Sequence, residues 1–394
     1  MEPYSTETLL QHLGEEEPFP YGAVAPPIVQ TSLFHTRSLR ERYETPESMP
    51  YHYSRVSNPT LELAERKIAM LEHTEGALCF SAGMGAIASV LLTFTQAGDH
   101  VICVDTAYPP TRDLLTNWLP RYGVETTFVS GETLESFQQA LRPNTRLIYL
   151  ESPSSLVFRL QDLQAVAEWA RSKGILTVCD NSWATPLFQN PHTLGIDLVV
   201  HSASKYLAGH SDLVAGVAAG RREHLTPLQK TRELLGTTLE PFGAWLLIRG
   251  LRTLSVRMAR HHTSGLRVAQ WLAEQPMIAK VHHPGLPQHP QHALAQKQMR
   301  GYGSLFSFET YPIRKEQAFA FTDALKLFRF GPSWGGYESL MLGWALEEPD
   351  ESGRARWLFR IYIGLEDPED LIRDLAQGIG HLEATEGAQK IAKG

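Results

Sequence analysis

The chain of 394 residues is long enough for two ordinary domains, and its 43% apolar and 20% charged residues are typical of a globular protein. These proportions exclude a disordered or fibrous chain, and no apolar run reaches the ~20 residues that a membrane helix needs. With 36 Lys and Arg against 43 Asp and Glu, the net charge is −7 and no dense basic run occurs, so we expect neither nucleic acid nor a membrane as a partner.

The N-terminal stretch differs from the rest of the chain. Residues 1–55 are polar, rich in Pro, Glu and Tyr, and have no sustained hydrophobic period, so we expect an extended arm. Its acidic start also lacks the basic and apolar regions of a secretory signal. A helix is predicted directly after the arm, because Asn58-Pro59-Thr60 is a typical helix start.

Short apolar runs alternate with helix-like segments in the next part of the chain. Continuous apolar strands separated by helices indicate a parallel sheet with helices on both faces. We therefore predict an α/β domain over residues 56–245. The expected strands are 76–80, 100–105, 125–130, 145–151, 175–180 and 197–202, and the expected helices between them are 84–95, 110–121, 132–141 and 160–173.

The pattern changes after about residue 222. A long helical stretch, 240–275, leads to a Pro/His-rich loop, shorter strand-like pieces and a final helix after Asp367-Pro368. Residues 246–394 are therefore predicted to form a smaller C-terminal α+β domain. We expect the pair His261-His262 on a helix surface. We predict no metal site in the loop, because prolines separate its histidines and acidic or Cys partners are missing. These loop histidines are His282, His283, His289 and His292.

Two polar residues follow buried strands at the edge where open α/β sheets bind ligands. Asp180 ends the run ILTVCD, and Lys205 lies just past DLVVHS. An acid there can pair with a protonated pyridine nitrogen, and a desolvated lysine can form a Schiff base, so the two form the pair that a pyridoxal phosphate enzyme requires. Taken alone, Asp180 is better explained as a cap of the turn Asn181-Ser182, and Lys205 as a surface lysine.

A third candidate is the turn Ser81-Ala82-Gly83-Met84, between an expected strand and an expected helix. Glycine lets the backbone approach a ligand, and the start of a helix favours a phosphate group. The turn lacks the GxGxxG pattern, so by itself it is best explained as an ordinary tight connection.

Six segments occur in order from Tyr53 almost to the end of the chain: YSRVSNPT, SAGMGAIAS, CDNSWATP, HSASKYLAGHSD, SWGGYESL and RIYIGLED. Together they resemble the Cys/Met-metabolism family of pyridoxal-phosphate enzymes. The resemblance implies pyridoxal 5'-phosphate as cofactor and the aspartate-aminotransferase fold, fold type I. That fold is a mostly parallel seven-stranded sheet with helices on both faces, plus a smaller C-terminal α+β domain.

The resemblance also implies roles for individual residues. Lys205 would form the Schiff base with the cofactor and, with Tyr108, move the substrate's Cα proton, while Asp180 would hold the ring nitrogen. Tyr108 would also stack on the pyridine ring. The residues implied at the cofactor phosphate are Gly83, Met84, Ser202 and Ser204, with Tyr53 and Arg55 of a neighbouring subunit. Those implied at the substrate are Arg360, which would bind its α-carboxylate, Ser333, Ser155 and Tyr53.

Departures from the γ-acting branches indicate β-elimination. Those branches usually have Glu-Ser-Leu-Gly-Gly where this chain has Pro332 and Trp334. The segment SWGGYESL is similar to the bacterial cystathionine β-lyase branch, and Pro332 departs from that pattern as well. Ser155 replaces the usual Asn, and Pro109-Pro110-Thr111 follow Tyr108 where methionine γ-lyases have a Cys. The resemblance thus implies cleavage of L-cystathionine to homocysteine, pyruvate and ammonia in methionine biosynthesis, with cysteine or cystine as further substrates. Cystathionine γ-synthase or γ-lyase activity is the alternative.

The same resemblance predicts self-association. If Tyr53 and Arg55 act in a neighbouring subunit, the active form is at least a dimer, and the family resemblance implies a dimer of dimers. The three cysteines, Cys79, Cys103 and Cys179, are widely spaced within apolar runs, so we expect a reduced, cytoplasmic protein. A rival hypothesis is an idle pyridoxal-phosphate fold that acts as a regulator, which the complete set of catalytic residue types disfavours.

Overall fold

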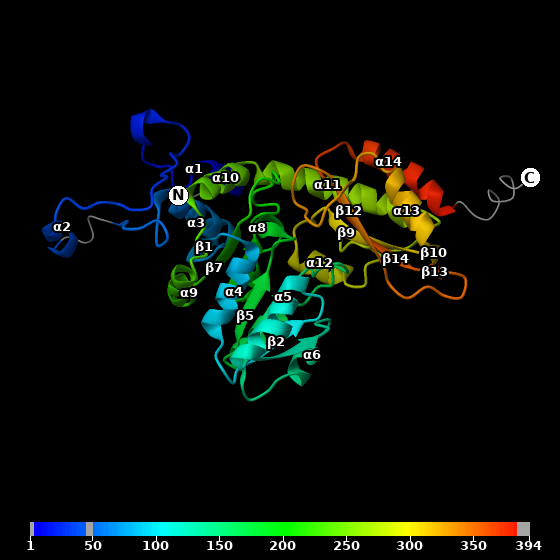
Figure 1. Cartoon of the computed structure of the whole chain (residues 1–394), viewed down its shortest axis with the longest axis horizontal. Helices are drawn as coiled ribbons and strands as arrows, with labels where there is room; N and C mark the ends of the chain where they lie inside the picture. Colours follow the sequence, from blue (N-terminus) through cyan, green and yellow to red (C-terminus); the bar gives the residue numbers. More distant parts are fainter. Residues whose placement is uncertain (1–3, 45–49, 384–394) are drawn as a thin grey trace, which may run out of the picture. The chain divides into compact units, whose positions relative to one another are not determined.

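The computed structural model describes residues 4–44 and 50–383, and the chain divides into two compact units (Figure 1). The first unit holds Met1–Ser154 and Leu160–Ser255, and the second holds Ser155–Arg159 and Val256–Gly394. The three domain segments predicted from the sequence stay a prediction, and parts of the first and the last of them lie outside the described residues.

The first unit contains a seven-stranded sheet with the strand order β1-β7-β6-β5-β4-β2-β3. Strand β7 is antiparallel to β1 and β6, and the other neighbouring strands are parallel. The predicted mostly parallel sheet is therefore confirmed. Its strands are β1 (Gly76–Phe80), β2 (His100–Val104), β3 (Glu125–Val129), β4 (Thr145–Glu151), β5 (Leu176–Asp180), β6 (Leu198–Ser202) and β7 (Gly216–Gly220).

The core of this unit lies against both faces of the sheet. Every residue of β2 is buried. On the neighbouring strands, Leu147, Ile148 and Val178 have no exposed surface. Successive residues of a strand point to opposite faces, so continuous burial means that both faces are covered, as the apolar runs predicted.

Strand β7 is not predicted by the sequence pattern, because GVAAG shows no alternation and only one β-branched residue. Space explains its small residues: a Cβ on Gly216 would lie 2.1 Å from the carbonyl oxygen of Ala82. The glycine therefore lets the chain just before the helix α4 (Gly83–Phe94) approach the strand closely.

Two of the α-helices of the first unit, α1 and α2, lie in the N-terminal arm, which the sequence predicted to be extended. Helix α3 begins as predicted, since the Asn58 side chain accepts the Thr60 N–H at 2.9 Å. The expected helix 110–121 is instead the short α5, a π turn and a 3-10 turn, because Pro120 removes an amide donor from the helical ladder. The α-helices are α1 (Thr6–His12), α2 (Leu39–Glu44), α3 (Pro59–Glu72), α4, α5 (Pro109–Asp113), α6 (Leu134–Gln139), α7 (Leu163–Ser172), α8 (Thr185–Phe188), α9 (Arg222–Leu235) and α10 (Pro241–Arg252).

The second unit has a five-stranded, mostly antiparallel sheet with the order β11-β12-β14-β9-β8, which confirms a C-terminal α+β unit. The expected helical stretch 240–275 is two helices, α10 and α11, separated at Thr253. The elements from there are α11 (Leu254–Ala273), β8 (Ile278–His282), α12 (His292–Gln298), β9 (Leu305–Thr310), β10 (Ile313–Arg314), α13 (Lys315–Ala324), β11 (Arg329–Phe330), β12 (Leu340–Ala345), β13 (Arg354–Ala355), β14 (Trp357–Tyr362) and α14 (Pro368–Glu383).

One histidine of α11 corrects a sequence expectation. The prediction of a surface position is wrong for His261, which has no exposed surface. Its Nδ1 lies 3.2 Å from the carbonyl oxygen of Ile363 and its Nε2 lies 3.3 Å from the hydroxyl of Tyr362, so β14 and the residue after it give the buried ring polar partners. His262 is partly buried, and its Nδ1 accepts the N–H of Tyr302 at 3.1 Å.

Neither a metal-ligand cluster nor a helix suited to a membrane span occurs among the described residues. No group of His, Cys, Asp or Glu among them is arranged to hold a metal ion. None of the helices within this part of the chain combines the length and the apolarity that a membrane span requires. The three cysteines are buried free thiols.

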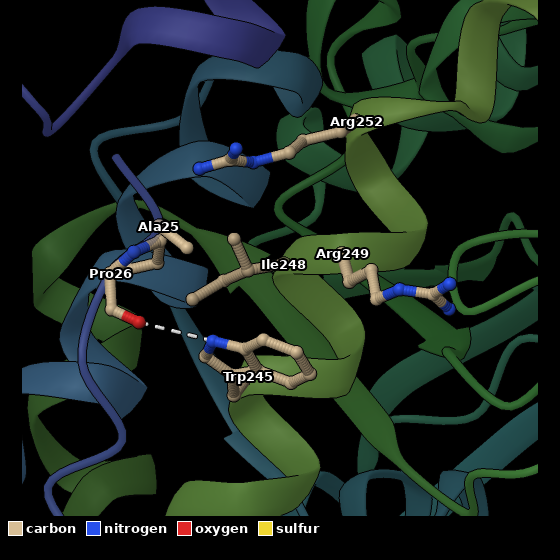
Figure 2. Close-up of a pocket in the computed structure, with 6 residues that line it drawn as sticks. All are labelled: Ala25, Pro26, Trp245, Ile248, Arg249 and Arg252. Atoms are coloured by element: carbon tan, nitrogen blue, oxygen red, sulfur yellow. Dashed lines mark hydrogen bonds between the residues drawn. The ribbon is translucent and has the colours of Figure 1, made fainter. Parts of the chain in front are cut away.

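A pocket of about 220 Å³ lies between the N-terminal arm and α10 (Figure 2). The Trp245 indole N–H donates to the carbonyl oxygen of Pro26 at 3.1 Å and ties the arm to the helix. Arg252 pairs with Glu15 at 2.8 Å. None of the predicted site residues lines this pocket. Its lining residues are Ala25, Pro26, Trp245, Ile248, Arg249 and Arg252.

Candidate active site

Asp180 is the last residue of β5, at the carboxyl edge of the parallel strands, and only 8% of its surface is exposed. Its Oδ1 accepts the N–H of Ser182 at 2.9 Å, so it does cap the following turn. Burial raises the pKa of the Asp180 carboxyl. Hydrogen bonds from Ser182 and the electrostatic influence of His201 offset only part of that rise. A cationic ligand atom at this edge would lower the pKa again and stabilise the carboxylate.

Consecutive hydrogen bonds connect Asp180 to the loop that carries Lys205. The Ser182 hydroxyl accepts the N–H of Ser202 at 2.6 Å, and the Ser202 carbonyl accepts the N–H of Lys205 at 3.1 Å. Ser202 is the last residue of β6, the strand beside β5. The structure therefore brings Asp180, Ser202 and Lys205 together at one sheet edge, as the sequence predicted for parallel neighbours.

The start of α4 lies against the same loop. A Cβ on Gly83 would lie 3.0 Å from the Ser202 Cβ, so the two residues are in direct contact. The N-cap residue Ala82 has no polar side chain, and the first amides of a helix lack acceptors within the helix. The Ser204 hydroxyl donates to the Ala215 carbonyl at 3.2 Å and accepts the Ala215 N–H at 2.9 Å. The helix amides beside the Ser202 hydroxyl suit a phosphate group, whereas the Ser204 hydroxyl already uses its proton on Ala215.

Tyr108 forms the N-cap of α5, and 44% of its surface is exposed. Its N–H donates to Oε2 of Glu151 at 2.6 Å. Its carbonyl accepts the N–H of Thr111 at 2.9 Å, and the Thr111 hydroxyl lies 4.0 Å from the Met84 sulfur. These contacts place Tyr108 next to the turn that contains Met84.

Two of these residues, Glu151 and Ser182, are absent from the sequence-based site. Glu151 carries the same signal as Asp180, an acid that ends a buried apolar run, and that signal could have found it. Ser182 offers no comparable signal, because its role depends on the turn after β5 and on the neighbouring strand.

Tyr53 and Arg55 make their contacts elsewhere in the first unit. The Arg55 guanidinium donates to the Glu233 carbonyl, and the Arg55 carbonyl accepts the Thr238 hydroxyl at 2.7 Å. The Arg55 guanidinium lies 5.6 Å from the centre of the Tyr53 ring. The end of α9 and the chain after it thus hold this part of the arm.

The remaining predicted residues belong to the second unit. Nη2 of Arg360, on β14, lies 3.4 Å from the carbonyl oxygens of Gly331 and Ser333, so these residues are neighbours. Ser155 begins the short segment of this unit that the chain inserts between β4 and α7, and its carbonyl accepts the N–H of Val157 at 2.8 Å.

The residues of the first unit fit pyridoxal phosphate. A buried carboxylate with a raised pKa matches a protonated ring nitrogen, which would supply the missing positive charge. The close approach at Gly83 and the first-turn amides of α4 suit the phosphate, and Lys205 supplies an amine for the aldehyde.

Comparisons with known proteins agree with this chemistry. The family model described as Cys/Met metabolism PLP-dependent enzyme matches residues 7–380. An L-methionine gamma-lyase of Fusobacterium nucleatum is 39% identical over 91% of this chain and 94% of its own. A putative cystathionine beta-lyase of Rhizobium johnstonii is 35% identical over 96% of each chain.

A solved structure matches the whole fold as well. It is cystathionine gamma synthase from Xanthomonas oryzae pv. oryzae in complex with aminoacrylate and cysteine. It superimposes with a TM-score of 0.89 at 34% identity and covers 98% of this chain and 100% of its own. The motifs, the sheet and these matches agree: the chain belongs to the Cys/Met-metabolism family of pyridoxal-phosphate-dependent enzymes, and pyridoxal phosphate is its cofactor.

Proposed function

We propose that the protein is a cystathionine β-lyase, which cleaves L-cystathionine to homocysteine, pyruvate and ammonia. The loop Ser333-Trp334-Gly335-Gly336-Tyr337 of the second unit supports this most, because the γ-acting branches usually differ there. Strand β14 holds the loop at two points: Arg360 lies 3.4 Å from the Ser333 carbonyl, and the Tyr362 hydroxyl donates to the Gly336 carbonyl at 2.7 Å. The segment that distinguishes the branches is thus fixed beside the proposed carboxylate-binding arginine.

The chain's own residues would divide the chemistry among them. When bound, pyridoxal phosphate supplies a ring that accepts the negative charge left on the substrate Cα. Lys205 Nζ is the nucleophile for the cofactor aldehyde and the base that takes the Cα proton. The Asp180 carboxylate keeps a proton on the ring nitrogen, since a neighbouring negative charge favours the cationic form. Arg360 binds the substrate α-carboxylate through two parallel hydrogen bonds.

The remaining residues would hold the reactants in place. The Tyr108 ring stacks on the cofactor ring and assists the proton transfer. The bond between Cβ and sulfur breaks with its electron pair going to sulfur, which takes a proton and leaves as homocysteine. Water then replaces the amino group, so that pyruvate and ammonia complete the balance. The proposed phosphate ligands are Gly83, Met84, Ser202 and Ser204, and the proposed contacts of the substrate include Ser155 and Ser333.

We further infer that a second copy of the chain completes each site, with a dimer of dimers as the full assembly. The arm that carries Tyr53 exposes large apolar side chains: Val24, Leu39 and Tyr43 are 88%, 74% and 77% exposed. Figure 1 shows α2, in blue, standing away from the sheet of this unit. Apolar surface of this extent is typical of a contact with another chain, and it supports a role for Tyr53 and Arg55 in the neighbouring site.

A complementation experiment tests this shared site. Lys205→Ala and Arg55→Ala are each expected to lose activity as pure proteins. If Arg55 acts in the neighbouring subunit, a mixed dimer of the two variants contains one site with both residues intact. Refolding the variants together should therefore restore activity, and a mixture as inactive as its components would contradict the shared site.

Product analysis tests the β-lyase activity itself. Purified holoenzyme is incubated with L-cystathionine, and the keto acid and the thiol are identified by chromatography. β-Elimination gives pyruvate and homocysteine. γ-Elimination gives 2-oxobutyrate and cysteine, and that result would replace the proposal with the second candidate.

The second candidate is γ-chemistry, as cystathionine γ-lyase or γ-synthase. It is favoured by the names of two matched proteins, an L-methionine gamma-lyase at 39% identity and a cystathionine gamma synthase at 34%. An assay with an activated homoserine ester and cysteine separates the two γ activities, since only a synthase forms cystathionine from them.

A further inference from the structure

Two acids end neighbouring strands of the first sheet. Glu151 is the last residue of β4, Asp180 is the last residue of β5, and the two are paired in register. Both are 8% exposed. Paired residues on neighbouring strands point to the same face and lie about 4.8 Å apart, so two nearly buried carboxyl groups share one face of the carboxyl edge.

The two acids have different partners. Asp180 accepts the N–H of Ser182, in the turn after its own strand, at 2.9 Å. Glu151 accepts the N–H of Tyr108, in the loop after β2, at 2.6 Å. Hydrogen bonds from backbone amides to carboxylates are short and about twice as strong as those between neutral groups. Glu151 is therefore directed at Tyr108.

This contact leaves the Tyr108 backbone little freedom. Its N–H is held by Glu151, and its carbonyl accepts the N–H groups of Thr111 at 2.9 Å and Arg112 at 3.2 Å. Tyr108 thus joins the loop after β2 to α5, as the N-cap of that helix. With both backbone polar groups engaged, the position of its half-exposed ring depends on the side-chain torsions alone.

We propose that Glu151 is a positioning residue for the reaction: its carboxylate holds the Tyr108 backbone and so fixes the ring that lies against the cofactor. This rests on the proposed stacking role of Tyr108. A ring displaced by a fraction of an ångström would change the stacking and the path of the Cα proton, because catalysis depends strongly on the placement of reacting groups.

Two variants of the holoenzyme separate positioning from charge. Glu151→Ala removes the acceptor, and we expect kcat/KM to fall about ten- to hundredfold, mainly through kcat. Glu151→Gln keeps an oxygen that can accept the Tyr108 N–H, and we expect it to restore most of that loss. Equal losses in both variants would show that the charge matters rather than the hydrogen bond, and would overturn the proposal.

A double-mutant cycle tests whether Glu151 acts through Tyr108. In a Tyr108→Ala background no ring remains to be positioned. Adding Glu151→Ala should then lower kcat/KM by less than about threefold. The full loss in both backgrounds, or no loss in the parent enzyme, would contradict the proposal. Glu168→Ala, on the exposed face of α7, is the matched control, and thermal unfolding of every variant checks the fold.

The visible circular dichroism of the bound cofactor provides a readout that needs no substrate. The band should change in Glu151→Ala and return toward the parent shape in Glu151→Gln, since it reports the surroundings of the cofactor ring. An unchanged band in Glu151→Ala would contradict the positioning role. This result holds whether or not cystathionine is the substrate, so a failed product assay and a failed positioning role remain distinguishable.

Discussion

The two units differ in the balance of the polar groups that they bury. The first unit buries charges in pairs: Arg232 lies 2.5 Å from Glu65, and Lys67 lies 3.0 Å from Glu15. Most of the buried histidines of the described residues lie in the second unit, although His100 and His201 are buried in the first. Burial lowers the pKa of His261 to about 3, so the ring stays neutral in the fold. The first unit thus holds these two buried ion pairs, whereas the second, which also buries Arg257, holds more of the buried histidines.

The Arg232 pair shows what a buried charge can do for the site. Arg232 donates to Glu65 and, at 2.9 Å, to the carbonyl of Cys79, and Glu65 accepts the Cys79 N–H at 2.8 Å. One ion pair therefore joins α9, α3 and β1. Burial raises the pKa of the Glu65 carboxyl despite the arginine, because desolvation outweighs the attraction.

One histidine of the second unit, His283, has aromatic rings beside it. His283 is fully buried, with its ring 5.3 Å from that of Phe306 and 5.9 Å from that of Tyr302, and burial lowers its pKa to about 3. His289, close by in sequence, has its pKa lowered to about 4 for the same reason. Protonation would place a cation in these surroundings, so the fold opposes it.

Breaking the buried pair should have the largest effect on stability. Arg232→Ala leaves the Glu65 carboxylate without its cation, and we expect the free energy of unfolding to fall by about 3–5 kcal/mol. Urea unfolding followed by circular dichroism measures this change. A second variant, Arg232→Ala with Glu65→Ala, should recover part of the loss, because the buried charge is then gone as well. A loss below about 1 kcal/mol in the single variant would show that the pair is not a structural charge pair.

Lower pH should have the next largest effect on stability, and mainly in the second unit. The folded pKa values of His261 and His283 lie below the unfolded value of about 6.5, so below that pH the unfolded chain binds more protons than the folded one. The contribution of these two histidines to the free energy of unfolding is fully present above pH 6.5. It decreases as pH falls toward 3, by up to about 1.4 kcal/mol per group and pH unit. Asp180 and Glu65, with raised pKa values, act in the opposite direction.

Hydrogen exchange measured by mass spectrometry at pH 7 and pH 5 checks this difference. Peptides of the second unit should lose protection at pH 5 before those of the first unit. His283→Gln should reduce the pH dependence by about one group, whereas His381→Gln, at an exposed position of α14, should leave it unchanged. Loss of protection in the first unit alone would contradict the assignment.

Breaking an exposed ion pair should have the smallest effect on the free energy of unfolding. Arg267 lies 2.8 Å from Glu369, and about half of each side chain is exposed (46% and 51%). Solvent screens such a pair, so we expect Arg267→Ala to cost less than about 1 kcal/mol in the same urea experiment. A cost equal to that of Arg232→Ala would remove the distinction between the buried and the exposed pair.

The sheet that carries the cofactor site was predictable because its strands follow simple rules. The apolar runs that became β5 and β6 end at polar residues, Asp180 and Ser202, which lie at the sheet edge where ligands bind. Strand β7 was not predictable, because its contact with Ala82 requires small residues there rather than β-branched ones. Thr253, which separates two helices with continuous apolar periodicity, was not predictable either.

The site was predictable in its chemistry and less so in its supports. Lys205 was predicted from its place just past a buried strand, and the motif resemblance gave it the same role. Tyr108 was supplied by the resemblance alone, because its position in a turn follows no hydrophobic period. Glu151 ends a buried apolar run as Asp180 does, but its contact with Tyr108 depends on the fold, and Ser182 has no signal in the sequence at all. The burial of His261 depends on contacts with the distant strand β14, which local periodicity does not show.

The order in which the chain builds its two units limits how the protein can be dissected. Residues 155–159 belong to the second unit, although they connect β4 to α7 of the first. The chain finally leaves the first unit after residue 255, which lies within α11. No single stop codon or protease cut therefore releases either unit whole. Truncated genes would encode fragments that lack part of a core, so the units have to be studied by substitution within the full-length chain.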